Sequence, residues 1–155
     1  MHSELADVYR RVYREPPYLE GEVEVARFGV LFAEHSALPG FAMKTVSADG
    51  ALVGFAYGVG REAGWWPAHA TTSAPDQLDG EPLFYVYELA LVPELRGRGQ
   101  GRALLADLLK DRPERFAVLA SRVTSPARRL YDRWGWRKVG EFGSRGVDLL
   151  ALDLR

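Results

Sequence analysis

Residues 94–101 read ELRGRGQG, so three glycines and two arginines lie within one short stretch. An apolar run, FYVYELALVP, precedes it over residues 84–93, and an amphipathic run, RALLADLLKD, follows it over residues 102–111. The first pattern is typical of a strand buried on both faces, and the second of a helix with one apolar stripe. The stretch therefore predicts a tight strand-to-helix turn with a local concentration of positive charge.

Such a turn is suited to binding an anion. A helix that begins near Gly99 leaves its first amide N–H groups without partners inside the helix, and its macrodipole adds positive charge there. Glycine lets an anion approach the backbone closely, and arginine supplies charged donors. These features favour a phosphate or pyrophosphate site over a tight turn with solvated arginines. The residues expected to contact the anion are Arg96, Gly97, Arg98, Gly99, Gln100, Gly101 and Arg102.

Composition limits the remaining possibilities. The 155 residues are 47% hydrophobic and 26% charged, which predicts one globular domain over residues 1–155. The net charge of -1 gives no general attraction to nucleic acid or anionic lipid, so neither is expected as a partner. The chain has no cysteine, and its histidines lack metal-ligand spacing, so no metal is expected. No signal peptide or membrane span is expected, which predicts a cytoplasmic location.

Hydrophobic periodicity predicts the element order α-α-β-β-β-α-β-α-β-β. Helices are expected from about residue 3 to 13, 20 to 37, 99 to 111 and 126 to 134, and hairpins over 41–60 and 136–154. Asp49-Gly50 suits the first hairpin's turn, which needs positive φ. Because hairpins and βαβ units are mixed, we expect an α/β fold with a mixed sheet.

Residues 61–82 form a long connection that contains Trp65 and Trp66. Connections of this length inside a domain are usually functional or mobile. One interpretation is a flap that covers an acceptor, and the other is a loop pinned by a buried tryptophan. The same connection contains the acidic residues Asp76, Asp79 and Glu81. We expect these to be solvated charges rather than a site that attracts a cationic amine.

Two motifs together indicate a family. Residues 96–101, RGRGQG, match the pattern Arg/Gln-x-x-Gly-x-Gly/Ala, and residues 125–136, SPARRLYDRWGW, match a later helix-strand pattern. In this order and about 25 residues apart, they resemble the GNAT superfamily of acetyl-CoA-dependent N-acetyltransferases. The resemblance is close over residues 83–142 and implies a mixed, mostly antiparallel sheet flanked by about four helices, with splayed central parallel strands. The strand that usually precedes the first helix is not evident, and a homodimer is a candidate assembly.

The resemblance also implies a reaction. An amine of a small molecule or peptide attacks the thioester of acetyl-CoA directly, without an acyl-enzyme. Besides the turn, the residues that the resemblance places near the coenzyme are Ala90, Leu91, Val92, Ser125 and Arg128. Arg128 could equally be a solvated surface charge. The alternative function is a non-catalytic sensor that binds coenzyme A or acyl-CoA.

Two residues are candidates for proton transfer. Glu88 is the one acidic residue in an otherwise apolar strand, and burial would raise its pKa toward that of a general base. Its alternative is a structural carboxylate paired with an arginine or a helix terminus. Tyr131 matches the tyrosine that faces the coenzyme sulfur in the family, which implies a general acid. Its alternative is a core tyrosine packed with Leu130 and Trp134. The acceptor amine is not specified by the sequence.

Overall fold

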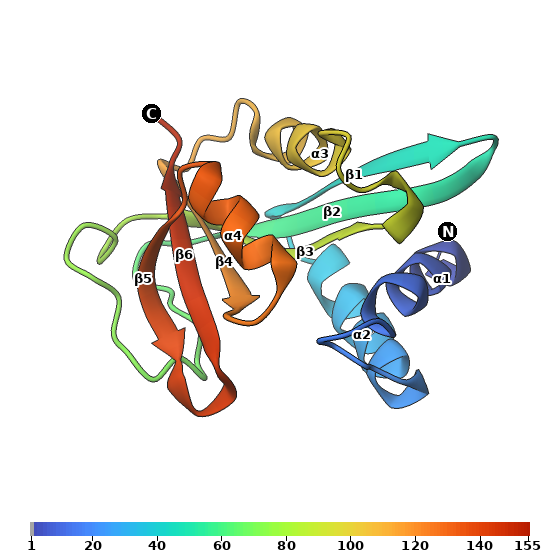
Figure 1. Ribbon diagram of the computed structural model, residues 1–155. Helices are drawn as coiled ribbons and strands as arrows, with labels where there is room; N and C mark the ends of the chain where they lie inside the picture. Colours follow the sequence, from blue (N-terminus) through green and yellow to red (C-terminus); the bar gives the residue numbers. More distant parts are fainter. Residues whose placement is uncertain (1) are drawn as a thin grey trace. The chain divides into compact units, whose positions relative to one another are not determined.

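The computed structural model describes residues 2–155 and has the predicted order of helices and strands (Figure 1). The helices are α1 (His2–Tyr13), α2 (Glu22–Ser36), α3 (Gln100–Leu109) and α4 (Pro126–Arg133). The strands are β1 (Phe41–Ala48), β2 (Ala51–Arg61), β3 (Leu83–Leu91), β4 (Phe116–Arg122), β5 (Arg137–Phe142) and β6 (Val147–Asp153). Two short 3-10 helices, η1 (Pro93–Leu95) and η2 (Gly143–Arg145), complete the order.

The strands follow the hydrogen-bonded order β1-β2-β3-β4-β6-β5. β3 and β4 run parallel, with Leu83–Val86 paired to Phe116–Leu119, whereas β1–β2, β4–β6 and β5–β6 are antiparallel. The predicted mixed, mostly antiparallel sheet with four helices is therefore confirmed. Splaying of the parallel strands stays a prediction. Within the described residues, no strand precedes α1.

The chain divides into two compact units, and β3 contributes to both. The first unit comprises the chain up to Val59 together with Glu88–Lys110, and the second comprises Gly60–Tyr87 and Asp111–Arg155. None of the helices in the described residues is long and apolar enough to cross a membrane.

The first unit is held together by aromatic packing between its helices and β2. The ring of Tyr9 in α1 stacks on Phe28 in α2 with a centroid distance of 4.4 Å. Phe28 in turn lies 5.6 Å from the ring of Phe55 in β2. Figure 1 shows α1 and α2 beside each other, as expected for two helices that bury facing apolar stripes.

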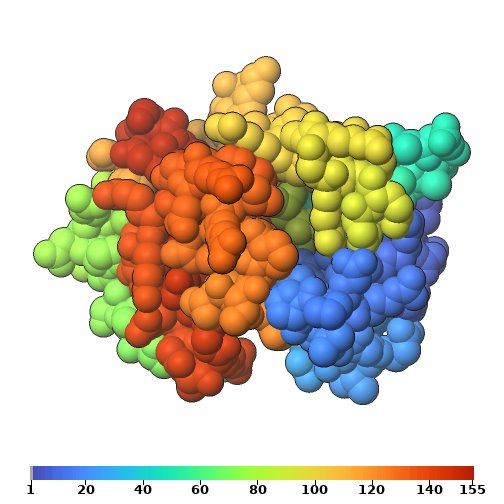
Figure 2. Space-filling view, in the orientation of Figure 1, coloured from blue at the N-terminus to red at the C-terminus, as the bar shows by residue number. Residues whose placement is uncertain are grey.

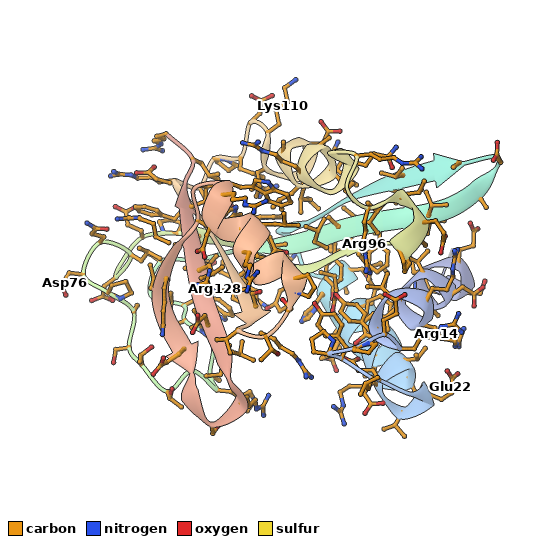
Figure 3. The ribbon with its side chains drawn as sticks, in the orientation of Figure 1. Arg14, Glu22, Asp76, Arg96, Lys110 and Arg128 are labelled. Atoms are coloured by element: carbon orange, nitrogen blue, oxygen red, sulfur yellow. The ribbon has the colours of Figure 1, made fainter. Side chains whose placement is uncertain are left out.

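The second unit contains a core of side chains from β3, β4 and β6. Trp65 and Trp66 both pack against this core, and Trp66 Nε1 donates a hydrogen bond to the Thr72 carbonyl at 3.0 Å. The Thr71 hydroxyl donates to the Glu141 carbonyl in β5 at 2.8 Å. These contacts favour the pinned loop over the flap. Asp76 is exposed at the tip of this connection (Figure 3).

Gly54 marks a close approach between β2 and β3. A Cβ atom at this position would lie 3.1 Å from the Ala90 carbonyl oxygen and 2.9 Å from Leu91 Cδ1. Leu91 could rotate away, but the carbonyl oxygen belongs to the backbone. The glycine therefore lets β2 lie against the segment of β3 that leads into the glycine-arginine turn.

We expect Gly54→Ala to lower the free energy of unfolding by about 1–3 kcal/mol, because the added methyl group overpacks this contact. Gly29→Ala is the matched control, since a Cβ there meets no atom within 4 Å and the residue lies inside α2. The control should gain about 0.5–1 kcal/mol from helix propensity. Denaturant unfolding of both variants provides the measurement, and equal effects would contradict the close approach.

Candidate active site

The glycine-arginine turn has the backbone that the sequence predicts. Gly97 and Gly99 have φ values of +80° and +77°, a region that L side chains rarely adopt. Gly99 is the N-cap of α3, and no side chain among the described residues caps that helix. The first amide N–H groups of α3 therefore lack the usual side-chain acceptor and are available to an anion.

The turn leaves space for a ligand against its backbone. A Cβ atom built on Gly97, Gly99 or Gly101 would meet no atom within 4 Å. Residues 96–99 are exposed, and Figure 2 shows this yellow segment at the molecular surface. An anionic group could therefore reach the amides without moving a neighbouring side chain.

The three arginines of the turn have different surroundings. Arg96 Nη1 lies 3.2 Å from Glu15 Oε2, and its Nε donates to the Leu91 carbonyl at 3.3 Å (Figure 3). Arg98 and Arg102 are exposed and form no hydrogen bond or ion pair with any residue that the structure describes. Arg96 thus fixes the turn to the end of β3, whereas Arg98 and Arg102 keep their donors for a ligand.

The end of β3 presents a backbone N–H group to the edge that faces away from β2. The Val92 N–H donates to the Val53 carbonyl of β2 at 2.9 Å. Since successive residues of a strand direct their N–H groups to opposite edges, the Leu91 N–H points away from β2. Ala90 and Val92 are buried on either side of it. Leu91 is therefore the residue of this segment whose amide could bind a carbonyl oxygen.

Glu88 is half-buried in β3, and its partner is a phenol. Tyr13 Oη donates a hydrogen bond to Glu88 Oε2 at 2.6 Å, where the sequence led us to expect an arginine or a helix terminus. The pKa of Glu88 is raised to about 8. Burial is the largest cause, the Tyr13 hydrogen bond acts in the opposite direction and lowers the pKa, and the charge of Glu20 raises it. The predicted effect of burial on this carboxyl is present.

Sequence reasoning missed Tyr13 of α1 as part of the site, and Tyr9 lies beside it on the same helix. Tyr9 Oη donates to Glu20 Oε1 at 2.6 Å, and the rings of Tyr9 and Tyr13 lie 4.4 Å apart. The available signal was their spacing, because tyrosines four residues apart lie on the same buried stripe of the helix. Such spacing is typical of helix packing but could not reveal a contact with β3.

In the second unit, the start of α4 is capped as predicted. Ser125 Oγ accepts a hydrogen bond from the Arg128 N–H at 3.3 Å, and Pro126 follows at the first helical position. Arg128 is only 15% exposed and points onto β6, where its Nε donates to Asp148 Oδ2 at 3.1 Å (Figure 3). Its guanidinium also pairs with Asp132. Arg128 is therefore held by carboxylates and is not a solvated surface charge.

Tyr131 is 7% exposed, and its ring contacts two indole rings. Its ring centroid is 5.7 Å from Trp134 and 5.9 Å from Trp136. Leu130, the neighbour that the core interpretation expected, is exposed. Both tryptophans thus pack against the phenol ring and restrict its movement.

The sequence matches the model of the Acetyltransferase (GNAT) family over residues 3–136. The chain belongs to the GNAT acetyltransferase family. The matched region includes both motifs that suggested the resemblance, so that prediction is confirmed. No curated protein matches the chain significantly.

Several solved structures share the fold of this chain at low sequence identity. The PaiA N-acetyltransferase of Thermoplasma acidophilum, solved with coenzyme A, is 14% identical with a TM-score of 0.69, and the match covers 98% of this chain and 92% of that one. NAA60 of Arabidopsis thaliana, solved with a bisubstrate analogue, is 17% identical with a TM-score of 0.65, and the match covers 99% of this chain and 94% of that one. A GNAT acetyltransferase of Brucella melitensis, solved with acetyl-CoA, is 18% identical with a TM-score of 0.61, and the match covers 99% of this chain and 82% of that one. The GNAT fold is therefore confirmed over nearly the whole chain.

We expect Arg128→Ala to lower the free energy of unfolding of this GNAT protein by about 1.5–3 kcal/mol. Among the described residues, Asp148, which is 7% exposed, would keep only Lys138 as its cationic partner, at 3.2 Å. Arg129→Ala is the matched control, because Arg129 is exposed one residue further along α4, and it should change stability by less than about 0.5 kcal/mol. Similar unfolding midpoints for the two variants would show that the Arg128–Asp148 pair is not stabilising.

Proposed function

We propose that this chain is an acetyl-CoA-dependent N-acetyltransferase that moves an acetyl group to a primary amine of a small molecule or peptide. The observation that carries the proposal is the open glycine turn at the uncapped end of α3, in the same unit as the half-buried carboxyl of Glu88. The turn suits a pyrophosphate, and the carboxyl suits proton removal from an amine.

The coenzyme is held mainly through backbone groups and two arginines. The amides of residues 99–102 bind the pyrophosphate, and Arg98 and Arg102 add charge at its rim. Support comes from the free donors of these arginines and from the PaiA and Brucella melitensis relatives, which were solved with coenzyme A and acetyl-CoA. Ser125 and Arg128 remain candidate coenzyme contacts, with the Arg128 guanidinium already paired to carboxylates.

The reaction is a direct attack on the thioester. Glu88, in its deprotonated form, removes a proton from the amine as the new N–C bond forms. The Leu91 N–H donates a hydrogen bond to the thioester oxygen, where negative charge develops. As the C–S bond breaks, Tyr131 gives its phenolic proton to the departing thiolate. The products are an amide and free coenzyme A.

Binding and turnover assays separate this function from its alternatives. Acetyl-CoA and coenzyme A should raise the unfolding temperature, whereas ATP should raise it less. A panel of amino acids, peptides, polyamines and aminoglycosides, each mixed with acetyl-CoA, should release free thiol for at least one amine. Binding without thiol release from any amine would favour the sensor. Equal stabilisation by ATP, or none by any ligand, would contradict coenzyme-A binding.

We expect Gly99→Asp to weaken coenzyme-A binding about a hundredfold or more. The added carboxylate fills the space over the turn and repels the pyrophosphate. Gly80→Asp is the control, since its φ of +78° is nearly that of Gly99 at +77° and its Cβ also meets no atom within 4 Å. The backbone strain is thereby matched. Calorimetric titration with coenzyme A measures the difference, and retained binding in Gly99→Asp would exclude this turn as the pyrophosphate site.

We expect kcat/KM to rise with pH toward a plateau above about pH 8, because a general base acts in its deprotonated form and the Glu88 pKa is about 8. Glu88→Gln should lower kcat/KM about a hundredfold or more at pH 8 and remove this limb, leaving activity to rise only as the amine itself loses its proton. Glu34→Gln changes an exposed glutamate of α2 and serves as the control. An unaltered pH profile in Glu88→Gln would make Glu88 a structural carboxyl.

We expect Tyr131→Phe to lower kcat about a hundredfold while the dissociation constant of coenzyme A changes little, since the substitution removes the proton donor and keeps the ring. Tyr57→Phe is the control for removal of a hydroxyl from a buried tyrosine. Tyr57 belongs to the first unit, where its Oη lies 3.0 Å from His35 Nδ1. Steady-state kinetics and calorimetry on the same preparations give both quantities. Wild-type turnover in Tyr131→Phe would exclude it as the acid.

A further inference from the structure

We propose that Tyr13 is a positioning residue for Glu88, holding Oε2 of the carboxyl so that Oε1 is the oxygen that takes the proton from the acceptor amine. The inference rests on the proposed acetyl transfer to an amine. Tyr13 belongs to the last turn of α1 and lies 75 residues from Glu88 in the chain, yet Tyr13 Oη and Glu88 Oε2 are 2.6 Å apart.

The two carboxyl oxygens have different surroundings. Oε2 accepts the Tyr13 hydrogen bond. Oε1 has no hydrogen-bond partner among the described residues. It is also not fully buried, so it reaches solvent. A carboxyl fixed through one oxygen and open at the other has a single site for proton transfer. Rotation of the group, which would blur that geometry, would break the hydrogen bond to Tyr13.

The phenol of Tyr13 is itself rigid and stays protonated. Its ring packs on Tyr9 at a centroid distance of 4.4 Å and meets the edge of Tyr18 at 4.9 Å. Burial and the nearby Glu88 charge raise the Tyr13 pKa well above its usual value, so it remains a donor throughout the working pH range. Proximity and fixed orientation of this kind support general-base catalysis.

Tyr13 also limits how basic Glu88 becomes. The groups that face this carboxyl are Tyr13 and Tyr9 from α1 and Glu20 from the turn that follows. Burial raises the Glu88 pKa and the negative charge of Glu20 raises it further, while the hydrogen bond from Tyr13 stabilises the carboxylate and lowers the pKa. Loss of Tyr13 Oη therefore leaves more of Glu88 protonated near neutral pH.

Tyr13→Phe tests the inference through the pH profile. The free energy of a hydrogen bond to a charged group corresponds to a pKa shift of about one unit or more. The midpoint of the rise of kcat/KM with pH should therefore move upward from about pH 8 by about one unit. Activity at pH 7 should then fall about tenfold and largely recover above pH 10. Tyr9→Phe is the matched control one turn earlier on α1, because its hydroxyl bonds to Glu20 and not to Glu88. Its limb should not move upward.

A loss of activity that is equal at every pH, with the limb unmoved, would overturn the inference. If Tyr13→Phe fails to fold, 3-fluorotyrosine incorporated at position 13 keeps the hydroxyl and makes it a stronger donor, so the limb should move downward. An unmoved limb in that variant would also overturn the inference.

A carbon-13 NMR titration of Glu88 makes the test independent of turnover. With the signal assigned by Glu88→Gln, the Glu88 midpoint in the free protein should rise in Tyr13→Phe and not in Tyr9→Phe. If wild-type protein acetylates no amine, the proposed function fails while this titration still reports the Tyr13–Glu88 contact. If wild-type protein is active and the midpoint does not change, only the inference fails.

Discussion

The placement of an ionisable carboxyl in β3 is the constraint on which the first unit depends. A strand between β2 and β4 must be largely apolar, and an unpartnered carboxylate there would be costly. Tyr13 satisfies one oxygen of Glu88 at 2.6 Å, and this contact requires α1 to end beside β3. The stacking of Tyr9 on Phe28 then fixes α1 against α2. The helices thus have a chemical role as well as a packing role, because they determine the polarity around a proposed base.

The glycine-arginine turn divides its work between backbone and side chains. Gly97 and Gly99 adopt positive φ and leave open space over the amides, which no residue with a Cβ could do without strain. Arg96 donates a hydrogen bond to the Leu91 carbonyl, so the turn is attached directly to the end of β3. The segment that would orient a thioester and the segment that would bind a pyrophosphate are therefore positioned by the same short stretch of chain.

Features governed by neighbouring residues were predictable, and long-range contacts were not. The apolar stripe of α3, the Ser125 cap and the Asp49-Gly50 turn, whose φ values are +52° and +78°, follow from periodicity, capping and turn chemistry. The pairing of Tyr13 with Glu88 joins residues 75 apart, and that of Arg128 with Asp148 joins residues 20 apart. Partners at such separations are chosen by tertiary packing. The sequence could therefore indicate that Glu88 lies in a largely apolar strand but could not name the group that forms a hydrogen bond with it.

The arginines near the glycine-arginine turn fall into a paired group and an unpaired group. Arg11 pairs with Glu94 and Arg96 with Glu15, which leaves Arg98 and Arg102 without partners among the described residues. Exposed ion pairs contribute only about 0–1 kcal/mol, so two unpaired arginines sacrifice little stability. Next to the positive end of α3, however, both add to one local field that acts on a bound anion. A chain of net charge -1 can thus attract a multiply charged phosphate ligand without becoming a general polyanion binder.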